Sequence, residues 1–383
     1  MRIGFDARFV TDRRTGLGGY CIWLLDALIR QNAGHEFVVF GDAAGDLKKI
    51  AAAAVVSLVP VPARAASGGW AGAVWGQQVD LARLINSYEL DIMHFPYYLE
   101  PAMVRMPFIL TIHDVDTFRN SGRHSAWTRL YHNSLTRLLA RRAAALVTVS
   151  EYSRDQIARC LNIPGRDIRV IGNGLSPLYN GGRPAGTAGM AAGGPASLPP
   201  AGYLLYAGGL GMRKNLKRMV DAFALAAEVT GAEPRLVITG ELAEVGQSLK
   251  TYVESRGQAG RVAFTGYVPD EQMPALYQGA LAALYPSLYE GFGLPVLEGM
   301  AMGVPVITSR DSAMAEVAGG CAVLVDPEDT LSIAAAIGAV LTDESLARAL
   351  GSRGPVRAAA FSWSAAAAGF HKLYEEIGGG ACA

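Results

Sequence analysis

Residues 203–215 read YLLYAGGLGMRKN, and this stretch decides the fold class of the chain. Its first part, Tyr203–Ala207, is a short apolar run of the kind that forms a buried β-strand. Glycines follow immediately, and the stretch from about Asn215 to Glu228 has the apolar periodicity of a helix. A strand, a glycine turn and a helix in this order are typical of one repeating unit of a parallel α/β sheet.

The same alternation of apolar runs and helical stretches continues on both sides of this unit. In the first half we expect strands at Arg2–Asp6, Phe37–Gly41, Val55–Val59, Asp91–Phe95, Phe108–His113, Leu146–Ser150 and Arg169–Ile171. In the second half we expect them at Tyr203–Ala207, Leu236–Thr239, Val262–Thr265, Ala282–Pro286, Val304–Thr308 and Ala322–Val325. The pattern therefore predicts an α/β chain with two doubly wound, Rossmann-like domains.

A change in composition separates the two halves. Residues 180–200 contain six Gly and four Pro with almost no large apolar side chain, which predicts a flexible linker or loop. We expect one domain over residues 1–178 and a second over 179–360 that includes this segment. The last helical stretch, Phe361–Ile377, places its apolar residues on one stripe, so we expect residues 361–383 to rejoin the first domain.

Composition and charge exclude several classes of protein. Hydrophobic residues make up 51% of the 383 residues and charged residues 18%, which excludes a disordered chain or a coiled coil. Lys and Arg total 34, as do Asp and Glu, so the formal net charge is zero and no overall electrostatic field attracts nucleic acid. Residues 50–63 form the longest weakly polar run, which is shorter than the ~20 residues of a membrane span. Asp6 and Arg8 lie where a signal peptide would need an apolar stretch, so we predict a cytoplasmic protein.

The glycine loop after Tyr203–Ala207 has the features of a diphosphate site. Gly209 and its neighbours allow the backbone to approach a ligand closely, and the following helix start presents free N–H groups. Arg213 and Lys214 add two cations at the same place. The alternative interpretation is a glycine turn with two solvated bases.

A second candidate loop reads SLYEGFGLPVLE at residues 287–298. Pro295 suits the first turn of a helix, which leaves the N–H groups of Gly293 and Leu294 available to an anion. Glu290 in the loop and Glu298 on the helix can each accept hydrogen bonds from a vicinal diol. The pair therefore fits a nucleotide sugar, which carries a ribose and a hexose. The alternative is two ordinary acids favoured by the helix dipole.

The first half offers a glycine loop of its own. Residues 14–20 read RTGLGGY before an apolar helix predicted over Cys21–Ile29, and Gly16, Gly18 and Gly19 permit close approach to a ligand. A dinucleotide fingerprint requires a third glycine at the position of Cys21 and a loop directly after the strand, so we reject NAD binding. A merely structural turn is the alternative.

The strand over Phe108–His113 ends in the sequence HDVD, which has two interpretations. His113 at the carboxyl end of the strand can act as a hydrogen-bonding or polarising group. Asp114 and Asp116 can instead form a D-x-D clamp for a divalent ion on a diphosphate. Because Arg213 and Lys214 already supply positive charge, we favour the first interpretation and predict no metal.

Between Phe118 and Ala145 the chain has six arginines and no acid. The stripe of apolar residues in this helical stretch comprises Trp127, Leu130, Tyr131, Leu135, Leu138 and Leu139. We predict a core-facing helix with a solvated basic side. The alternative is peripheral contact of residues 119–142 with anionic lipid on the inner face of the membrane, or with the phosphate of a lipid-linked acceptor.

These motifs together resemble the retaining glycosyltransferases of family 4, also called glycosyl transferases group 1. The most specific match runs from Phe264 to Thr308 and contains the family's motif of two glutamates separated by seven residues, Glu290 and Glu298. Residues 206–215, 149–153, 173–174 and the N-terminal glycine loop also match. The resemblance implies the GT-B fold, in which two Rossmann-like domains face each other across a cleft.

The resemblance also implies roles for individual residues. Arg213 and Lys214 would hold the donor diphosphate, Glu298 the ribose hydroxyls, and Glu290 would face the donor sugar. The implied catalytic residues are Glu290, His113, Arg213 and Lys214, and the implied donor-binding residues are Gly18, Gly19, Gly209, Arg213, Lys214, Glu290, Gly293, Leu294 and Glu298. No cofactor is implied beyond the donor substrate.

The implied activity is transfer of a sugar from a nucleoside diphosphate sugar to an acceptor hydroxyl, with retention and without a metal. The expected acceptor is a sugar or a lipid-linked saccharide in polysaccharide or glycolipid assembly, and nucleic acid is not an expected partner. The segment around Glu290 slightly favours GDP-mannose as donor. The alternatives are a sugar phosphorylase, a metal-dependent transferase built on Asp114 and Asp116, and a nucleotide-sugar binder without catalysis.

Overall fold

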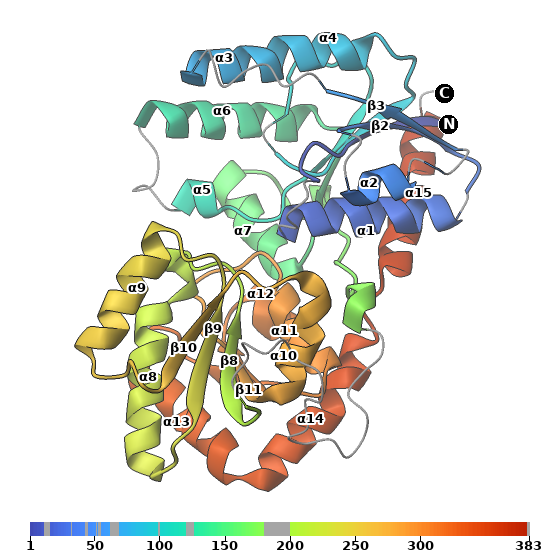
Figure 1. Ribbon diagram of the computed structural model, residues 1–383. Helices are drawn as coiled ribbons and strands as arrows, with labels where there is room; N and C mark the ends of the chain where they lie inside the picture. Colours follow the sequence, from blue (N-terminus) through green and yellow to red (C-terminus); the bar gives the residue numbers. More distant parts are fainter. Residues whose placement is uncertain are drawn as a thin grey trace. The chain divides into compact units, whose positions relative to one another are not determined.

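The computed structural model describes residues 1–10, 16–31, 33–42, 45–50, 52, 55–61, 69–98, 100–119, 126–179 and 200–380. The chain divides into two compact units, Met1–Gly174 with Ser362–Ala383 and Leu175–Phe361 (Figure 1). The predicted division after residue 178 falls inside the 3-10 turn η4 (Pro177–Tyr179) of the second unit. Residues 180–199 of the predicted linker lie outside the described residues.

The first unit contains a seven-stranded parallel sheet with the order β3-β2-β1-β4-β5-β6-β7. Its strands are β1 (Arg2–Asp6), β2 (Glu36–Phe40), β3 (Val56–Val59), β4 (Ile92–Phe95), β5 (Phe108–Thr111), β6 (Ala145–Thr148) and β7 (Ile168–Val170). Its helices are α1 (Gly16–Gln31), α2 (Gly45–Ile50), α3 (Gly69–Trp75), the π-helical η2 (Gly76–Asp80), α4 (Leu81–Asn86), α5 (Asp116–Arg119), α6 (Ala126–Arg142), α7 (Glu151–Leu161), η3 (Gly165–Asp167) and α15 (Trp363–Gly380). All residues of β4 and β5 are buried, as expected for central strands covered on both faces.

The second unit contains a six-stranded parallel sheet with the order β10-β9-β8-β11-β12-β13. Its strands are β8 (Tyr203–Ala207), β9 (Arg235–Thr239), β10 (Val262–Gly266), β11 (Ala280–Tyr285), β12 (Val306–Ser309) and β13 (Val323–Val325). Its helices are η4, η5 (Met212–Lys214), α8 (Leu216–Thr230), α9 (Glu244–Ser255), η6 (Asp270–Gln272), α10 (Met273–Gly279), α11 (Leu294–Ala301), α12 (Ala313–Ala318), α13 (Thr330–Thr342) and α14 (Glu344–Ala358). The predicted fold class, two doubly wound parallel sheets, is confirmed.

Local sequence explains several helix ends. Ser150 precedes α7, and its hydroxyl accepts a hydrogen bond from the Ser153 N–H at 3.0 Å. Asn162 ends the same helix in the left-handed conformation, with φ of 55°. In the C-terminal helix α15, Phe370 and Tyr374 are fully buried, and α15 packs against α1 within the first unit.

Helix α6 differs from its predicted orientation. Leu135 and Leu139 are buried as predicted, but Leu130 is 58% exposed and Leu138 is 48% exposed. The stripe therefore splits between a buried and a solvent-facing side, because a helical period shows which residues share a face but not how much of that face is covered. The side chain of Trp127 lies outside the described residues.

Within the described residues, no individual helix combines the length and apolar character that a membrane span requires. The residues of α13 and those of Glu344–Gly379 meet that requirement only as a pair bent by 94°.

Candidate active site

The basic pair Arg213 and Lys214 lies on η5, between β8 and α8, close to the predicted position. Gly208, directly after β8, has φ of 148°, a backbone conformation that would be strained in any residue with a side chain. Gly209 is exposed, and its carbonyl accepts a hydrogen bond from the Tyr206 hydroxyl at 2.7 Å. At Gly208 and Gly209 the loop therefore presents backbone without side chains, a few residues before the two cations.

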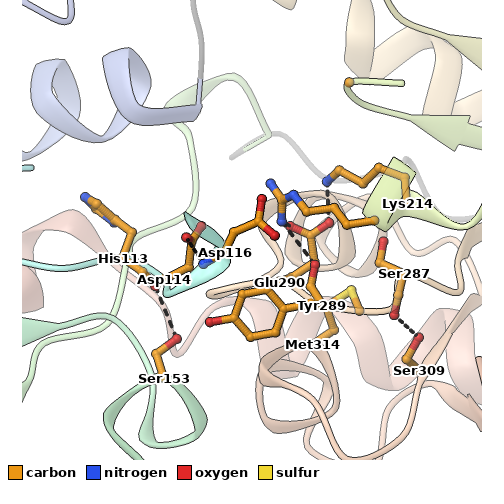
Figure 2. A network of polar contacts seen from close by, with 12 residues as sticks. His113, Asp114, Asp116, Ser153, Lys214, Ser287, Tyr289, Glu290, Ser309 and Met314 are labelled. Atoms are coloured by element: carbon orange, nitrogen blue, oxygen red, sulfur yellow. Dashed lines mark hydrogen bonds and ion pairs between the residues drawn. The ribbon is translucent and has the colours of Figure 1, made fainter. Parts of the chain in front are cut away.

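Glu290 forms ion pairs with both members of the basic pair (Figure 2). Arg213 Nη1 lies 2.6 Å from Glu290 Oε2, and Lys214 Nζ donates to Glu290 Oε1. The side chains of Arg213, Lys214 and Glu290 retain only 24%, 16% and 12% of their exposure, so solvent screens this cluster less than a surface pair. Two cations and one carboxylate leave one net positive charge.

The pKa of Glu290 lies below its ordinary value. Burial is the largest influence and raises the pKa, but the charges of Lys214 and Arg213 and a hydrogen bond from Lys214 together outweigh it. A hydrogen bond with the Ser287 side chain lowers it further. The carbonyl of Ser287 in turn accepts from Ser309 Oγ at 2.6 Å (Figure 2). Glu290 is therefore ionised at neutral pH.

Backbone contacts hold the two loops of this cluster together. The Leu288 N–H donates to the Arg213 carbonyl at 2.8 Å. Asn215, in the left-handed conformation with φ of 60°, donates from Nδ2 to the carbonyls of Pro286 and Pro327 at 3.0 and 2.6 Å. Sequence reasoning missed Asn215 as a site residue, and its place directly after Lys214 was the available signal. One main-chain hydrogen bond and the side chain of Asn215 therefore hold the two loops together.

Helix α11 begins where Pro295 predicts. Gly293 caps it with φ of 119°, and a Cβ there would lie 2.9 Å from Met314 Cγ, so both conformation and space require glycine. As the first residues of the helix, Gly293 and Leu294 have N–H groups without a partner inside the helix. This end of α11 can bind an anion.

Glu298, one turn into α11, is half-buried among tyrosine hydroxyls. The Tyr277 hydroxyl donates to Glu298 Oε2 at 3.1 Å, and the side chain of Tyr179 is a second hydrogen-bond partner. Burial raises the pKa of Glu298 to about 7, although these hydrogen bonds act in the opposite direction. Glu290 and Glu298, equivalent in the sequence motif, thus have pKa values shifted in opposite directions.

In the first unit, His113 follows β5. Its Nε2 lies 2.9 Å from the Pro96 carbonyl, which identifies Nε2 as the protonated nitrogen because a carbonyl can only accept. The Tyr20 ring packs edge-on against the imidazole, with centroids 4.5 Å apart. Burial lowers the pKa of His113 to about 4. His113 is therefore neutral at pH 7, with Nδ1 as an acceptor.

Asp116 is the first residue of the next helix, α5, and Asp114 lies two residues before it. The Asp116 N–H donates to Asp114 Oδ1 at 3.0 Å, at the beginning of α5 (Figure 2). In the part of the chain that the structure describes, no group of three or more His, Cys, Asp or Glu side chains has the arrangement of a metal site.

The N-terminal glycines lie inside a helix rather than before it. Helix α1 begins at Gly16, whereas the sequence predicts its start at Cys21. Gly18 and Gly19 are buried, and a Cβ on Gly19 would lie 2.8 Å from the Trp23 ring. Tight packing thus offsets the low helix propensity of glycine.

Two family models match the chain. Residues 199–357 match the family Glycosyl transferases group 1, and residues 15–177 match Glycosyltransferase Family 4. The chain is 33% identical over 280 residues to the O-antigen chain mannosyltransferase B of Escherichia coli, covering 73% of this chain and 72% of that protein.

Two solved structures share the fold. Sucrose-phosphate synthase from Thermosynechococcus elongatus has a TM-score of 0.79 at 20% identity, over 98% of both chains. The Anabaena protein Alr3699/HepE, in a complex with UDP and glucose, has a TM-score of 0.73 at 18% identity, over 98% of this chain and 100% of that one. The chain thus belongs to the glycosyl transferases group 1 and is a GT-B glycosyltransferase of family 4.

Proposed function

We propose that this glycosyltransferase moves mannose, with retention, from GDP-mannose to a hydroxyl of a sugar or lipid-linked saccharide in polysaccharide assembly. The O-antigen chain mannosyltransferase supports both the sugar and the kind of acceptor. The Anabaena relative bound to UDP and glucose makes a UDP-sugar the second candidate donor.

The cluster of Arg213, Lys214 and Glu290 carries the proposal. It combines two cations with an ionised carboxylate at the carboxyl ends of β8 and β11, where α/β sheets bind ligands. A diphosphate can replace Glu290 as the partner of the cations, which frees that carboxylate to face the sugar. The N-terminus of α11 lies on the same loop and provides further N–H donors.

In the reaction, the bond between the anomeric carbon and the diphosphate oxygen breaks, and the acceptor oxygen forms the new bond. The electron pair of the broken bond leaves with the diphosphate, where Arg213 and Lys214 stabilise the added charge. Glu290 stabilises the positive charge that develops at the anomeric carbon. The acceptor proton passes to the departing diphosphate, which is consistent with attack from the same face and retention.

His113 contributes a hydrogen-bond acceptor in this proposal. Because its Nε2–H is bound to the Pro96 carbonyl and the ring is neutral, only Nδ1 can meet a substrate hydroxyl. We propose that Nδ1 accepts from a hydroxyl of the donor sugar and that His113 does not donate a proton.

The function is tested with GDP-mannose, UDP-glucose and UDP-galactose, each supplied with a panel of mannose-containing acceptors. We expect transfer from GDP-mannose and a product with the donor's α configuration, read by NMR of the anomeric proton. Transfer only from a UDP-sugar, or a β-linked product, contradicts the donor or the stereochemistry. Nucleotide binding without transfer or donor hydrolysis favours a binder without catalysis.

Chelation provides a test of the metal and cofactor proposal. We propose that no cofactor is needed, because Arg213 and Lys214 supply the charge that a divalent ion would otherwise bring to the diphosphate. We expect the rate in 5 mM EDTA to stay within about twofold of the untreated rate. A rate abolished by EDTA and restored by Mn²⁺ or Mg²⁺ supports the alternative built on Asp114 and Asp116.

The exposed side of α6 supports peripheral membrane contact, as a lipid-linked acceptor would require. Leu130 and Leu138 lie there with the exposed Arg137 and Arg141, a combination that suits an anionic bilayer surface. We expect Leu130→Gln with Leu138→Gln to reduce flotation with phosphatidylglycerol vesicles about tenfold, at unchanged transfer to a soluble acceptor.

The matched control for the membrane test replaces two exposed leucines of the second unit, Leu324→Gln with Leu331→Gln. Flotation of the control should equal that of the wild type. If the wild-type chain fails to float with anionic vesicles, or the two double variants float alike, α6 is a solvated helix without a membrane role.

A further inference from the structure

The hydroxyl groups of several tyrosines in the second unit form a connected path that ends at Glu298. Tyr277, on α10, has its hydroxyl 2.8 Å from the Tyr285 hydroxyl and 3.1 Å from Glu298 Oε2. The side chain of Tyr285, the last residue of β11, has a hydrogen bond with the backbone of Ala207, the last residue of β8. The path thus joins the end of β8, where the glycine loop begins, to the Glu298 carboxylate on α11.

Donor counting gives this path a direction. The Ala207 N–H can only donate, so the Tyr285 oxygen accepts from it and the Tyr285 hydroxyl keeps its own proton. Either hydroxyl can be the donor between Tyr285 and Tyr277, and Tyr285 is the donor when the Tyr277 proton goes to Glu298. Tyr277 then uses its own single proton for Glu298. The Pro295 carbonyl, 3.2 Å from the Tyr277 hydroxyl, competes for that proton, but the charged carboxylate is the stronger acceptor. Every hydroxyl in the path therefore has a defined partner.

We infer that Tyr277 is a positioning residue: its hydroxyl, oriented by Tyr285, fixes the Glu298 carboxylate for recognition of the donor ribose. The inference rests on the proposed function, which assigns Glu298 to the ribose, and adds the residue that holds Glu298 in place. Sequence reasoning gave Tyr277 no role. It lies on a different helix from Glu298, and only the fold brings the two side chains together.

The surroundings of Glu298 show why its carboxylate needs such a partner. The groups that influence it are the hydroxyls of Tyr277, Tyr179 and Tyr285 and the negative charge of Asp270 on η6. Burial and Asp270 both raise the pKa of Glu298, whereas the hydrogen bonds from Tyr277 and Tyr179 lower it. A protonated Glu298 would have fewer acceptor sites than the carboxylate, so it would bind the two hydroxyls of a diol more weakly.

Loss of the Tyr277 hydroxyl therefore has a signed consequence. The hydrogen bond stabilises the charged form of Glu298, so its loss raises the pKa of that carboxyl group. Ribose recognition, which needs the carboxylate, then begins at a higher pH than in the wild type. A purely structural loss would lower the melting temperature but would not move this midpoint.

The test measures ribose recognition directly by calorimetry between pH 5.5 and 8.5. The probes are GDP and 2′,3′-dideoxy-GDP, or the UDP pair if UDP binds more tightly, and the readout is the ratio of the two Kd values. In the wild type we expect the ratio to be about tenfold or more at pH 8 and to fall as pH drops through the pKa of Glu298. In Tyr277→Phe we expect a severalfold smaller ratio and a midpoint shifted to higher pH.

Tyr203→Phe is the matched control. Tyr203 is also buried, and its hydroxyl donates to the carbonyl of Leu276, next to Tyr277, but it has no contact with Glu298 among those the structure describes. We expect its ratio and midpoint to equal those of the wild type. Tyr285→Phe removes only the hydroxyl that orients Tyr277, so it should shift the ratio of Kd values in the same direction as Tyr277→Phe but by less. If Tyr277→Phe does not fold, Tyr285→Phe replaces it in the test.

Combining the tyrosine variant with Glu298→Gln separates the inference from the proposed function. We expect Tyr277→Phe to have no further effect on the ratio once Glu298 is replaced, because the tyrosine acts through that carboxylate. A wild-type ratio in Glu298→Gln overturns the ribose role of Glu298 itself. A reduced ratio in Glu298→Gln together with a wild-type ratio and midpoint in both tyrosine variants overturns only the positioning role.

Discussion

Glu290→Gln should lower kcat by about a hundredfold or more while the affinity for GDP or UDP stays the same or increases. The two halves of this result have one cause. In the structure Glu290 is an ionised partner of Arg213 and Lys214, so it competes with a diphosphate for the same two cations. Its removal frees the cations for the nucleotide but takes away the carboxylate that faces the sugar as charge develops.

The measurement is kcat and donor KM together with calorimetry of the nucleoside diphosphate alone. Glu328→Gln, which neutralises an exposed acid of the same unit, is the control and should behave as the wild type. A wild-type kcat in Glu290→Gln removes Glu290 from the reaction. A joint loss of nucleotide affinity and melting temperature shows instead that the carboxylate only holds Arg213 and Lys214 in shape.

Much of the fold follows from sequence because strands and glycine turns carry strong local signals. Each run predicted as a strand forms one, and, as predicted, Glu290 lies in the loop after β11 and Glu298 in α11. The position of helix α1 shows the limit of such signals. A glycine run has low helix propensity, so Gly16–Gly19 is predicted as a loop, yet Gly19 leaves space for Trp23 and the helix begins at Gly16.

The candidate site was predictable in its residue types but not in its pairing. The sequence places Arg213 and Glu290 in two separate loops, and nothing local to either predicts that they form an ion pair. The opposite pKa shifts of Glu290 and Glu298 have the same origin, since cations surround one and tyrosine hydroxyls the other. Tertiary contacts supply these neighbours, so the role of Tyr277 emerges only from the structure.

Replacing Arg213 and Lys214 together by Ala should weaken binding of GDP or UDP by a factor of about 10² to 10⁴, since each charged contact contributes about 1.5–3 kcal/mol. The structure adds a further cause. With both cations removed, burial raises the pKa of Glu290, and above that pKa its negative charge lies near the diphosphate without an ion pair. The loss should therefore include repulsion as well as missing attraction.

That second cause makes a rescue experiment possible. Adding Glu290→Gln to the double variant should recover part of the nucleotide affinity, because the uncompensated negative charge disappears, while transfer stays abolished. Lys217→Ala with Arg256→Ala removes two exposed cations of the same unit and serves as the charge-matched control. Calorimetry at two salt concentrations measures all four proteins. If the Arg213 and Lys214 variant binds nucleotide as tightly as the wild type, the basic pair does not bind the diphosphate. If the nucleotide affinity is lost and Glu290→Gln does not restore any of it, Glu290 does not face the diphosphate.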